Sequence, residues 1–183
     1  MWTYLKTAFA FAKNIKQTGA ISQTSAAVER EITRFVSAEL PQVVVEFGPG
    51  MGNISRRIVA KMHPESQLIC IEVLPNFCAA LRKEFSGDKR VRIVEGSAAD
   101  VALYLPAGRN ADAIVSAVPL TILPEALRAQ MLAASKAVLS EGGRFSQILY
   151  SKKMLIRFEQ LFSQVEFKRV FNVPLGIVYH CRK

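Results

Sequence analysis

The chain has 183 residues, half of them apolar, and its 24 basic and 15 acidic side chains give a formal net charge of +9. The length predicts one domain with a sizeable core, and no continuous apolar run reaches the ~18 residues that a membrane-spanning helix needs. The positive charge favours an anionic partner, which would be nucleic acid, an acidic membrane surface or an anionic substrate. A basic protein without such a partner is the alternative interpretation.

The cysteines and histidines do not form a recognisable metal motif. Cys70, Cys78 and Cys181 are odd in number and lack CxxC spacing, which is typical of reduced thiols in a cytosolic protein. His63 and His180 have no motif partner, so we expect no zinc site and no Cys-His nucleophile pair. The N-terminus carries no cationic region followed by an apolar core and a small-residue cleavage site, so we expect no secretory signal.

Taken in chain order, the expected elements begin with two helical patterns, over about 2–16 and 25–40. Strands are then expected at 43–46, 67–71, 90–94, 111–116 and 144–150, and helices at 53–62, 75–85 and 124–139. This alternation predicts a doubly wound α/β fold with a mostly parallel sheet and helices on both faces. The runs VEFKRVFNV and GIVYHCRK follow without a helix between them, so we expect a C-terminal antiparallel hairpin to complete a seven-stranded sheet.

The stretch EFGPGMGN joins the first of these strands to a helix. The strand ends at Glu46, and Gly48, Gly50 and Gly52 precede a helix that begins at Asn53. Because glycine has no Cβ, the backbone can turn sharply there and approach a ligand closely. Strand, glycine loop and helix form a nucleotide-type pocket at the carboxyl end of a parallel strand. The spacing is not G-x-G-x-x-G, and no Gly-Lys-Ser/Thr is present to hold a triphosphate. A plain structural turn is the competing interpretation.

Three later strand ends are expected to reach the same pocket. Glu72, 24 residues after Gly48, suits an acceptor for two ribose hydroxyls, although a solvated cap is the alternative. In EGSAAD, Ser97 and Ala98 are placed to lie against an adenine ring, and a simple turn explains Ser97 equally well. The segment SAVPL, from Ser116 to Leu120, would lie beside the reacting groups.

These four elements, in this order, resemble class I S-adenosylmethionine-dependent methyltransferases. The resemblance implies a Rossmann-like methyltransferase domain over 41–183, preceded by N-terminal helices over 1–40 that face the membrane or the substrate. It also implies that Glu46 and the loop glycines Gly48, Gly50 and Gly52 hold the amino-acid part of the cofactor. Glu72 then binds its ribose. The family often has Asp where this chain has Ser97, so the adenine contact departs from the family pattern.

Two subfamilies share the E-x-G-P-G-x-G form. The rRNA adenine dimethyltransferases carry Asn-x-Pro-aromatic after the fourth strand, and this chain has SAVPL, which lacks the amide and the ring that hold a flipped base. Bacterial phospholipid N-methyltransferases are more similar, because SAVPL, QILY and GAISQTS match their segments, the last in part. This resemblance implies methyl transfer to the amine of an aminophospholipid, with phosphatidylethanolamine as the expected substrate. Methylation of adenine in rRNA is the alternative, and nucleic acid stays open as a partner.

The first helical pattern is a candidate membrane helix. On a helical wheel, Trp2 and Phe9 lie in an apolar half bordered by Lys6 and Lys13, an arrangement typical of a helix that lies in the lipid interface. An ordinary core helix is the alternative. With the lipid resemblance, we expect a cytoplasmic enzyme that associates peripherally with an anionic surface of the inner membrane.

The acceptor side has few candidate catalytic groups. Ser116, Tyr150 or a backbone carbonyl near Val118 would orient the amine, and water would take its proton. Packing of Tyr150 is the alternative. Pro119 belongs to the expected substrate side. The remaining candidates, expected to hold the lipid phosphate, are Ser22 and Ser25, although Ser25 is equally suited to be an N-cap.

Overall fold

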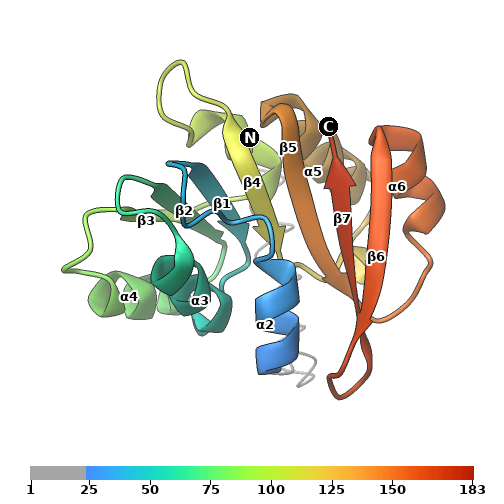
Figure 1. Ribbon diagram of the computed structural model, residues 1–183, viewed down its shortest axis with the longest axis horizontal. Coiled ribbons are helices and arrows are strands. Elements are labelled where there is room, and N and C mark those ends of the chain that lie inside the picture. The colour runs from blue at the N-terminus through green and yellow to red at the C-terminus, as the bar shows by residue number, and fades with distance from the viewer. Residues whose placement is uncertain (1–23) are drawn as a thin grey trace.

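The computed structural model describes residues 24–183, which form a seven-stranded sheet in the order β3-β2-β1-β4-β5-β7-β6 (Figure 1). The first five strands run parallel, whereas β7 is antiparallel to both β5 and β6. The expected mostly parallel sheet with a terminal antiparallel hairpin is therefore confirmed. The strands are β1 (Val43–Phe47), β2 (Gln67–Glu72), β3 (Val91–Glu95), β4 (Ala111–Ser116), β5 (Leu139–Leu149), β6 (Gln164–Val170) and β7 (Gly176–Arg182).

The helices agree with the expected pattern at three places and differ at two. The helix expected over 25–40 ends at Ile32, because the side chains of Ser37 and Gln42 bind backbone amides of the following segment and compete with helical hydrogen bonds. Helix α6 was not expected, since it is short and mostly exposed. The helices are α2 (Ala26–Ile32), α3 (Asn53–Lys61), α4 (Pro75–Glu84), α5 (Glu125–Val138) and α6 (Leu155–Leu161), with short 3-10 helices η1 (Ala98–Leu103) and η2 (Leu120–Ile122).

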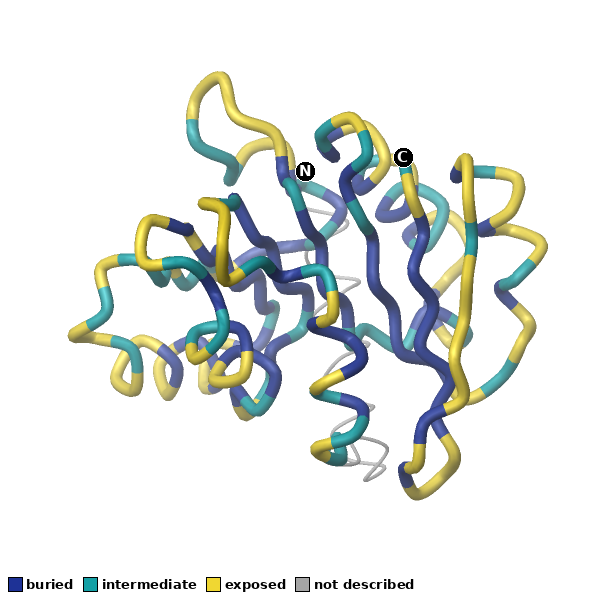
Figure 2. Tube along the Cα trace, viewed as in Figure 1, coloured by how far each residue is buried: buried dark blue, intermediate teal, exposed yellow. Residues whose placement is uncertain are grey.

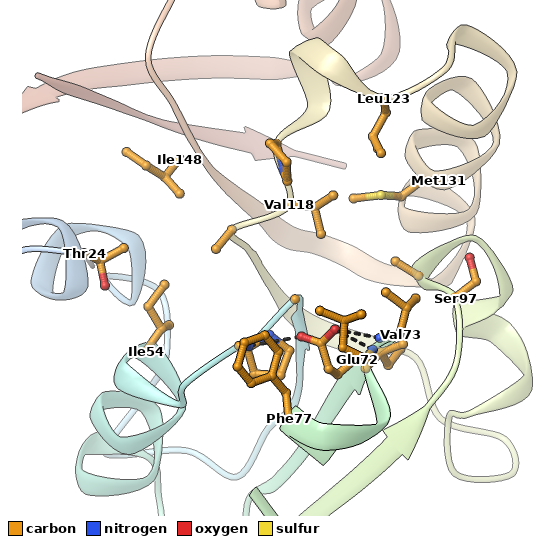
Figure 3. A pocket seen from close by; sticks show the side chains of 18 of the residues that line it. Thr24, Ile54, Glu72, Val73, Phe77, Ser97, Val118, Leu123, Met131 and Ile148 are labelled. Carbon is orange, nitrogen blue, oxygen red and sulfur yellow. Dashed lines mark hydrogen bonds between the residues drawn. The ribbon is translucent and has the colours of Figure 1, made fainter. Parts of the chain in front are cut away.

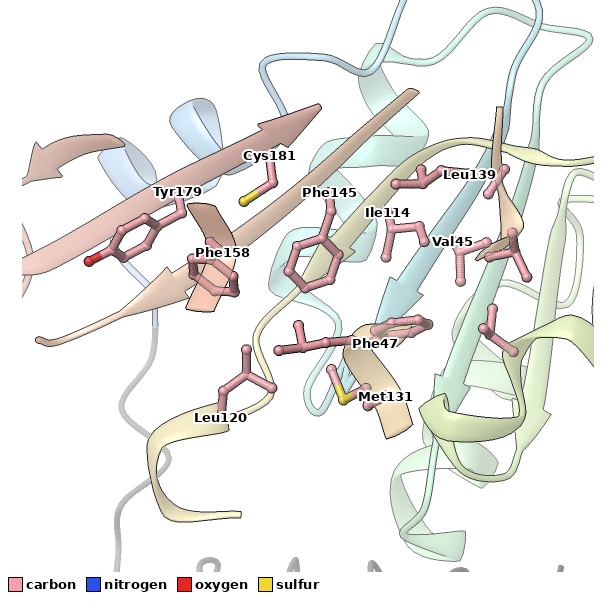
Figure 4. Close-up of a cluster of buried hydrophobic side chains, with 14 of the residues drawn as sticks. Val45, Phe47, Ile114, Leu120, Met131, Leu139, Phe145, Phe158, Tyr179 and Cys181 are labelled. Atoms are coloured by element: carbon pink, nitrogen blue, oxygen red, sulfur yellow. The ribbon is translucent and has the colours of Figure 1, made fainter. Parts of the chain in front are cut away.

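Side chains that alternate along the strands build a core on each face of the sheet. One face packs against α5, α6 and η1, and Figure 4 shows Phe145, Phe158 and Tyr179 together within this core. The rings of Phe158 and Tyr179 meet edge to face, with centroids 5.1 Å apart. The other face packs against α2 and α3, and Val44 of β1 belongs to it. Helices on both faces make the sheet doubly wound, as expected.

A buried polar cluster fastens α2 to the last strands. The His180 ring accepts or donates a hydrogen bond at Ser146 (2.8 Å from Nδ1 to Oγ), and its Nε2 lies 3.3 Å from the Glu31 carboxylate. The Lys168 ammonium donates to the other oxygen of Glu31 at 2.8 Å. Residues 24–40 are thus packed into the same body as the sheet, since Val28 of α2 is fully buried in the core.

This cluster gives the fold a pH-dependent contribution to stability. Burial, together with the positive charge of Arg34, lowers the pKa of His180 from 6.5 to about 4. Burial raises the pKa of Glu31, but hydrogen bonds from Lys168 and His180 outweigh burial and leave it below its ordinary value. As the pH falls from 6.5 towards 4, the unfolded chain takes up a proton on His180 that the folded chain does not, which favours unfolding.

We therefore expect the stability advantage of the wild-type chain over His180→Gln to shrink between pH 6.5 and pH 4, by on the order of 2–3 kcal/mol. Urea unfolding of both proteins across this range measures the difference. Burial raises the pKa of Glu46 to about 7, so that carboxyl titrates in the same range with the opposite sign. Glu46 is common to both proteins and cancels in the comparison. A difference that stays constant with pH would contradict the assignment.

Candidate active site

A cavity of about 380 Å³ opens where the parallel strands end (Figure 3). Its wall is formed by the glycine loop after β1, the end of β2, the segments after β3 and β4, and the end of β5. This is the edge of an open parallel sheet at which ligands are expected to bind. Glu72 is the only charged side chain among the lining residues that the structure describes.

The glycine loop has the backbone shape that requires glycine. Gly48, Gly50 and Gly52 all have positive φ, at 66°, 55° and 80°. A Cβ on Gly48 would lie 3.1 Å from a methyl group of Val118, and one on Gly52 would lie 2.9 Å from a methyl group of Leu81. The loop therefore passes close to the segment after β4 on one side and to α4 on the other.

The carboxylate of Glu72 ties the end of β2 to this loop. One oxygen accepts hydrogen bonds from the amides of Val73 (2.8 Å) and Leu74 (2.9 Å), and the other accepts from the amide of Gly50 (3.1 Å). Burial raises the pKa of Glu72, and the three amides partly offset this effect. Each carboxylate oxygen can accept more than one hydrogen bond, so the group can also bind ligand hydroxyls.

Glu46, the other acid of the predicted site, lies behind the glycine loop and does not line the cavity. It is fully buried and accepts a hydrogen bond from the Ser55 hydroxyl at 2.6 Å, with the Cys70 thiol 3.5 Å away. Its Oε1 has no hydrogen-bond partner among the described residues. The position of Glu46 links β1 to β2 and α3 directly beneath the loop.

Ser97 and Ala98 line the cavity where an adenine ring was expected. The Ser97 hydroxyl accepts a hydrogen bond from the Ala99 amide at 3.2 Å and caps η1, so the turn interpretation of this residue holds as well. Leu123 and Met131 line the same part of the cavity as Ser97 (Figure 3). This apolar wall was not predicted, because apolar residues at helical spacing in α5, such as Met131, are typical of core packing.

The segment after β4 corrects one expectation. Ser116 is fully buried and is not among the lining residues; its hydroxyl accepts a hydrogen bond from the Val118 amide at 3.4 Å. On the neighbouring strand, the side-chain amide of Gln147 donates to the Val118 carbonyl at 2.9 Å. Ser116 therefore binds the backbone of SAVPL and does not line the cavity. Pro119 and Val118 do line the cavity.

Asn172, which no sequence pattern indicated, joins the start of α2 to the turn after β6. Tyr150 lines the cavity; burial raises the pKa of its hydroxyl, and the Asn172 side chain partly offsets this rise. The side-chain oxygen of Asn172, Oδ1, accepts a hydrogen bond from the Ser25 backbone amide at 2.9 Å. The Ser25 hydroxyl accepts from the Val28 amide (3.2 Å) and donates to the Phe171 carbonyl (2.6 Å). Ser25 is thus the N-cap of α2, as the alternative interpretation stated.

Five of the predicted contacts with membrane or substrate lie outside the described residues: Trp2, Lys6, Phe9, Lys13 and Ser22. Within residues 24–183, no helix is both long and apolar enough to cross a bilayer. The same part of the chain contains no group of three or more His, Cys, Asp or Glu side chains placed to bind a metal ion.

Comparison with known proteins gives consistent matches along most of the chain. The family described as "Methyltransferase domain" matches residues 44–143. The ornithine lipid N-methyltransferase of Singulisphaera acidiphila is 31% identical over 178 residues, which cover 94% of this chain and 92% of that protein. The ribosomal RNA small subunit methyltransferase A of Prochlorococcus marinus is 26% identical over 85% of this chain, and the match spans about half of that relative, 54%.

Solved structures share the fold at low sequence identity. TrmN from Thermus thermophilus has a TM-score of 0.70 at 19% identity, with 85% of this chain and 48% of that chain covered. A Streptococcus mutans protein in complex with SAH has a TM-score of 0.65 at 12% identity, with 88% and 100% covered. With the family match and the lipid-enzyme relative, these likenesses show that the chain belongs to the class I S-adenosylmethionine-dependent methyltransferases.

Proposed function

We propose that this methyltransferase methylates the amine of a membrane aminolipid, such as phosphatidylethanolamine or an ornithine lipid. The observation that carries the proposal is the match to a lipid N-methyltransferase along 94% of the chain. The SAVPL and QILY segments, which carried the resemblance in the sequence, contribute Pro119 and Tyr150 to the same end of the cavity wall. We further propose that the enzyme is located in the cytoplasm and binds peripherally to the inner membrane.

The lining of the cavity fits S-adenosylmethionine. The glycine loop leaves open space at Gly50, where an added Cβ would have no neighbour within 4 Å. Glu72 would accept the two ribose hydroxyls, and Ser97 would lie at the adenine edge, beside the apolar wall that includes Leu123. The amino-acid part of the cofactor would lie along the glycine loop, and Glu46 would support that loop from the side away from the cavity. When bound, the cofactor supplies a methyl group that is already activated by its sulfonium.

The acceptor end of the cavity would position an amine and leave proton removal to water. Tyr150 is half-exposed, and burial raises the pKa of its hydroxyl, although the Asn172 side chain acts in the opposite direction. The hydroxyl is therefore protonated at neutral pH, and its oxygen would accept a hydrogen bond from the amine. Positioning of this kind is the main task left to the protein, because the methyl donor is already reactive. The proton leaves the lipid ammonium for solvent before the new N–C bond forms.

Methylation of adenine in rRNA is the second candidate function. The rRNA methyltransferase relatives and the net charge of +9 favour it. However, a flipped base requires stacking and hydrogen bonds to its edge. The segment 116–120 supplies neither an amide side chain nor an aromatic ring at this place, which is why a lipid amine is the preferred acceptor.

We expect Glu72→Gln to weaken binding of S-adenosylhomocysteine by more than about tenfold, since the amide can no longer accept from both ribose hydroxyls and Gly50. Isothermal titration calorimetry measures the dissociation constant. Glu95→Gln is the matched control, because Glu95 ends the neighbouring strand beside Glu72 and lies outside the cavity. Equal affinities for the two variants would refute the ribose role.

We expect the purified chain with labelled S-adenosylmethionine to transfer label to vesicles that contain phosphatidylethanolamine or ornithine lipid, and not to rRNA. Because the amine must lose its proton, the rate on lipid should rise with pH above 7. Thin-layer chromatography of extracted lipids and scintillation counting of precipitated RNA provide the two readouts. Label found only in RNA would overturn the proposal in favour of the second candidate.

We expect Tyr150→Phe to lower kcat on lipid by about tenfold and to leave the affinity for S-adenosylhomocysteine unchanged, because it removes only the hydroxyl that orients the amine. Tyr179→Phe is the control, since the Tyr179 hydroxyl donates to the Ser151 carbonyl at 3.3 Å, away from the cavity. An unchanged kcat for Tyr150→Phe would assign that residue to packing.

A further inference from the structure

We infer that the turn between β6 and β7, residues 171–175, is a membrane-docking element that enters the lipid interface beside the mouth of the cavity. We call this turn the hairpin tip. The inference rests on the proposed lipid substrate and adds to it a described surface by which the enzyme reaches that substrate.

The hairpin tip exposes three apolar side chains in five residues. Phe171 and Val173 are each 77% exposed, and Leu175 is 53% exposed. They alternate with Asn172, which is buried, and Pro174, and Figure 2 shows the exposed turn projecting from the end of the sheet. A cluster of large apolar groups left in water is unfavourable for a protein that acts only in solution, and it marks a surface that binds something apolar.

Basic residues precede this apolar tip on β6 and follow the neighbouring end of β5. They are Arg169 on β6 and Lys152 and Lys153 after β5. Arg169 and Lys153 form no ion pair with any described residue. No Asp or Glu occurs in the sequence after Glu166. Apolar groups flanked by cations match the interface of an anionic bilayer, where rings and aliphatic chains enter the headgroup region and cations meet lipid phosphates.

A nucleic acid would make favourable contacts with only some of the side chains on this surface. Phosphates would attract Arg169 and Lys153, but they offer nothing apolar to Val173 and Leu175. Aromatic stacking on a base would use Phe171 alone. The anionic lipid interface accounts for the charges and for all three apolar side chains, and it is therefore the occupant that the surface favours.

The hairpin tip adjoins the acceptor side of the cavity. Leu149, at the end of β5, pairs with Ile177, at the start of β7, so the turn emerges next to the strand end that carries Tyr150. The buried Asn172 side chain accepts from the Ser25 amide with its Oδ1 and donates to the Pro174 carbonyl with its Nδ2, which fastens the turn to the start of α2. A tip held in the headgroup layer would therefore bring the cavity mouth to the depth of lipid amines, and the substrate would not have to leave the bilayer.

A tryptophan placed in the hairpin tip tests the inference directly. The single native tryptophan, Trp2, is replaced by Phe in the full chain, and Phe171→Trp is added. With vesicles of equal parts phosphatidylglycerol and phosphatidylcholine, we expect its emission to shift to shorter wavelength and to be quenched by brominated acyl chains. Leu40→Trp in the same background is the control, because Leu40 is 67% exposed and precedes the amino end of β1, at the opposite edge of the sheet.

Three outcomes would overturn the inference. Emission at position 171 that does not change with vesicles excludes insertion. Emission that is already at short wavelength in buffer shows that another part of the chain covers the tip. An equal response at positions 40 and 171 shows unspecific adsorption. None of these readouts depends on catalysis, so the result stands even where no lipid is methylated and the proposed function fails.

A second measurement connects docking to turnover. For Phe171→Ser combined with Leu175→Ser, we expect the ratio of methylation rates on vesicle-embedded and detergent-dispersed phosphatidylethanolamine to fall about tenfold relative to wild type. Leu40→Ser should leave the ratio unchanged. A ratio that stays at the wild-type value in the double variant would show that the hairpin tip does not deliver the enzyme to its substrate.

Discussion

The arrangement of the site depends on one buried carboxylate, that of Glu72. Removing a carboxylate from water is costly unless hydrogen bonds replace its hydration. Here the amides of Val73, Leu74 and Gly50 replace it, two from the strand end and one from the glycine loop. Because the loop amide is one of the three, the charge of Glu72 and the shape of the loop stabilise each other. Hydrogen bonds within the protein thus hold the cavity edge, which limits the entropy that cofactor binding must overcome.

The acceptor side is shaped in the same way, by polar side chains that bind backbone groups. Ser116 and Gln147 lie beside each other on β4 and β5 and bind the amide and the carbonyl of Val118. Neither side chain lines the cavity. Together they fix the course of the SAVPL segment, and this leaves Pro119 and Tyr150 as the groups that a substrate would meet. Serine at position 116 therefore reflects the geometry of the SAVPL segment and does not identify a catalytic group.

The fold and the cofactor side were predictable because their signals are local. Alternating strand and helix periods identify a parallel sheet, and the carboxyl ends of its strands must meet at one edge, which placed Glu72 beside the glycine loop. The role of Ser116, the end of α2 and the part played by Asn172 were not predictable. They depend on contacts such as that between Ser25 and Asn172, 147 residues apart, and no short pattern in the sequence records such a pair.

Asn172 also explains how one end of the sheet can combine two kinds of surface. The buried side chain of Asn172 binds the amide of Ser25, the N-cap of α2, and the same five-residue turn exposes Phe171 and Leu175. Within this turn Asn172 is buried, whereas its neighbours Phe171 and Val173 are both exposed. The geometry that closes the cavity edge thus exposes the apolar side chains next to it, and a substrate site bordered in this way suits a molecule that is itself part polar and part apolar.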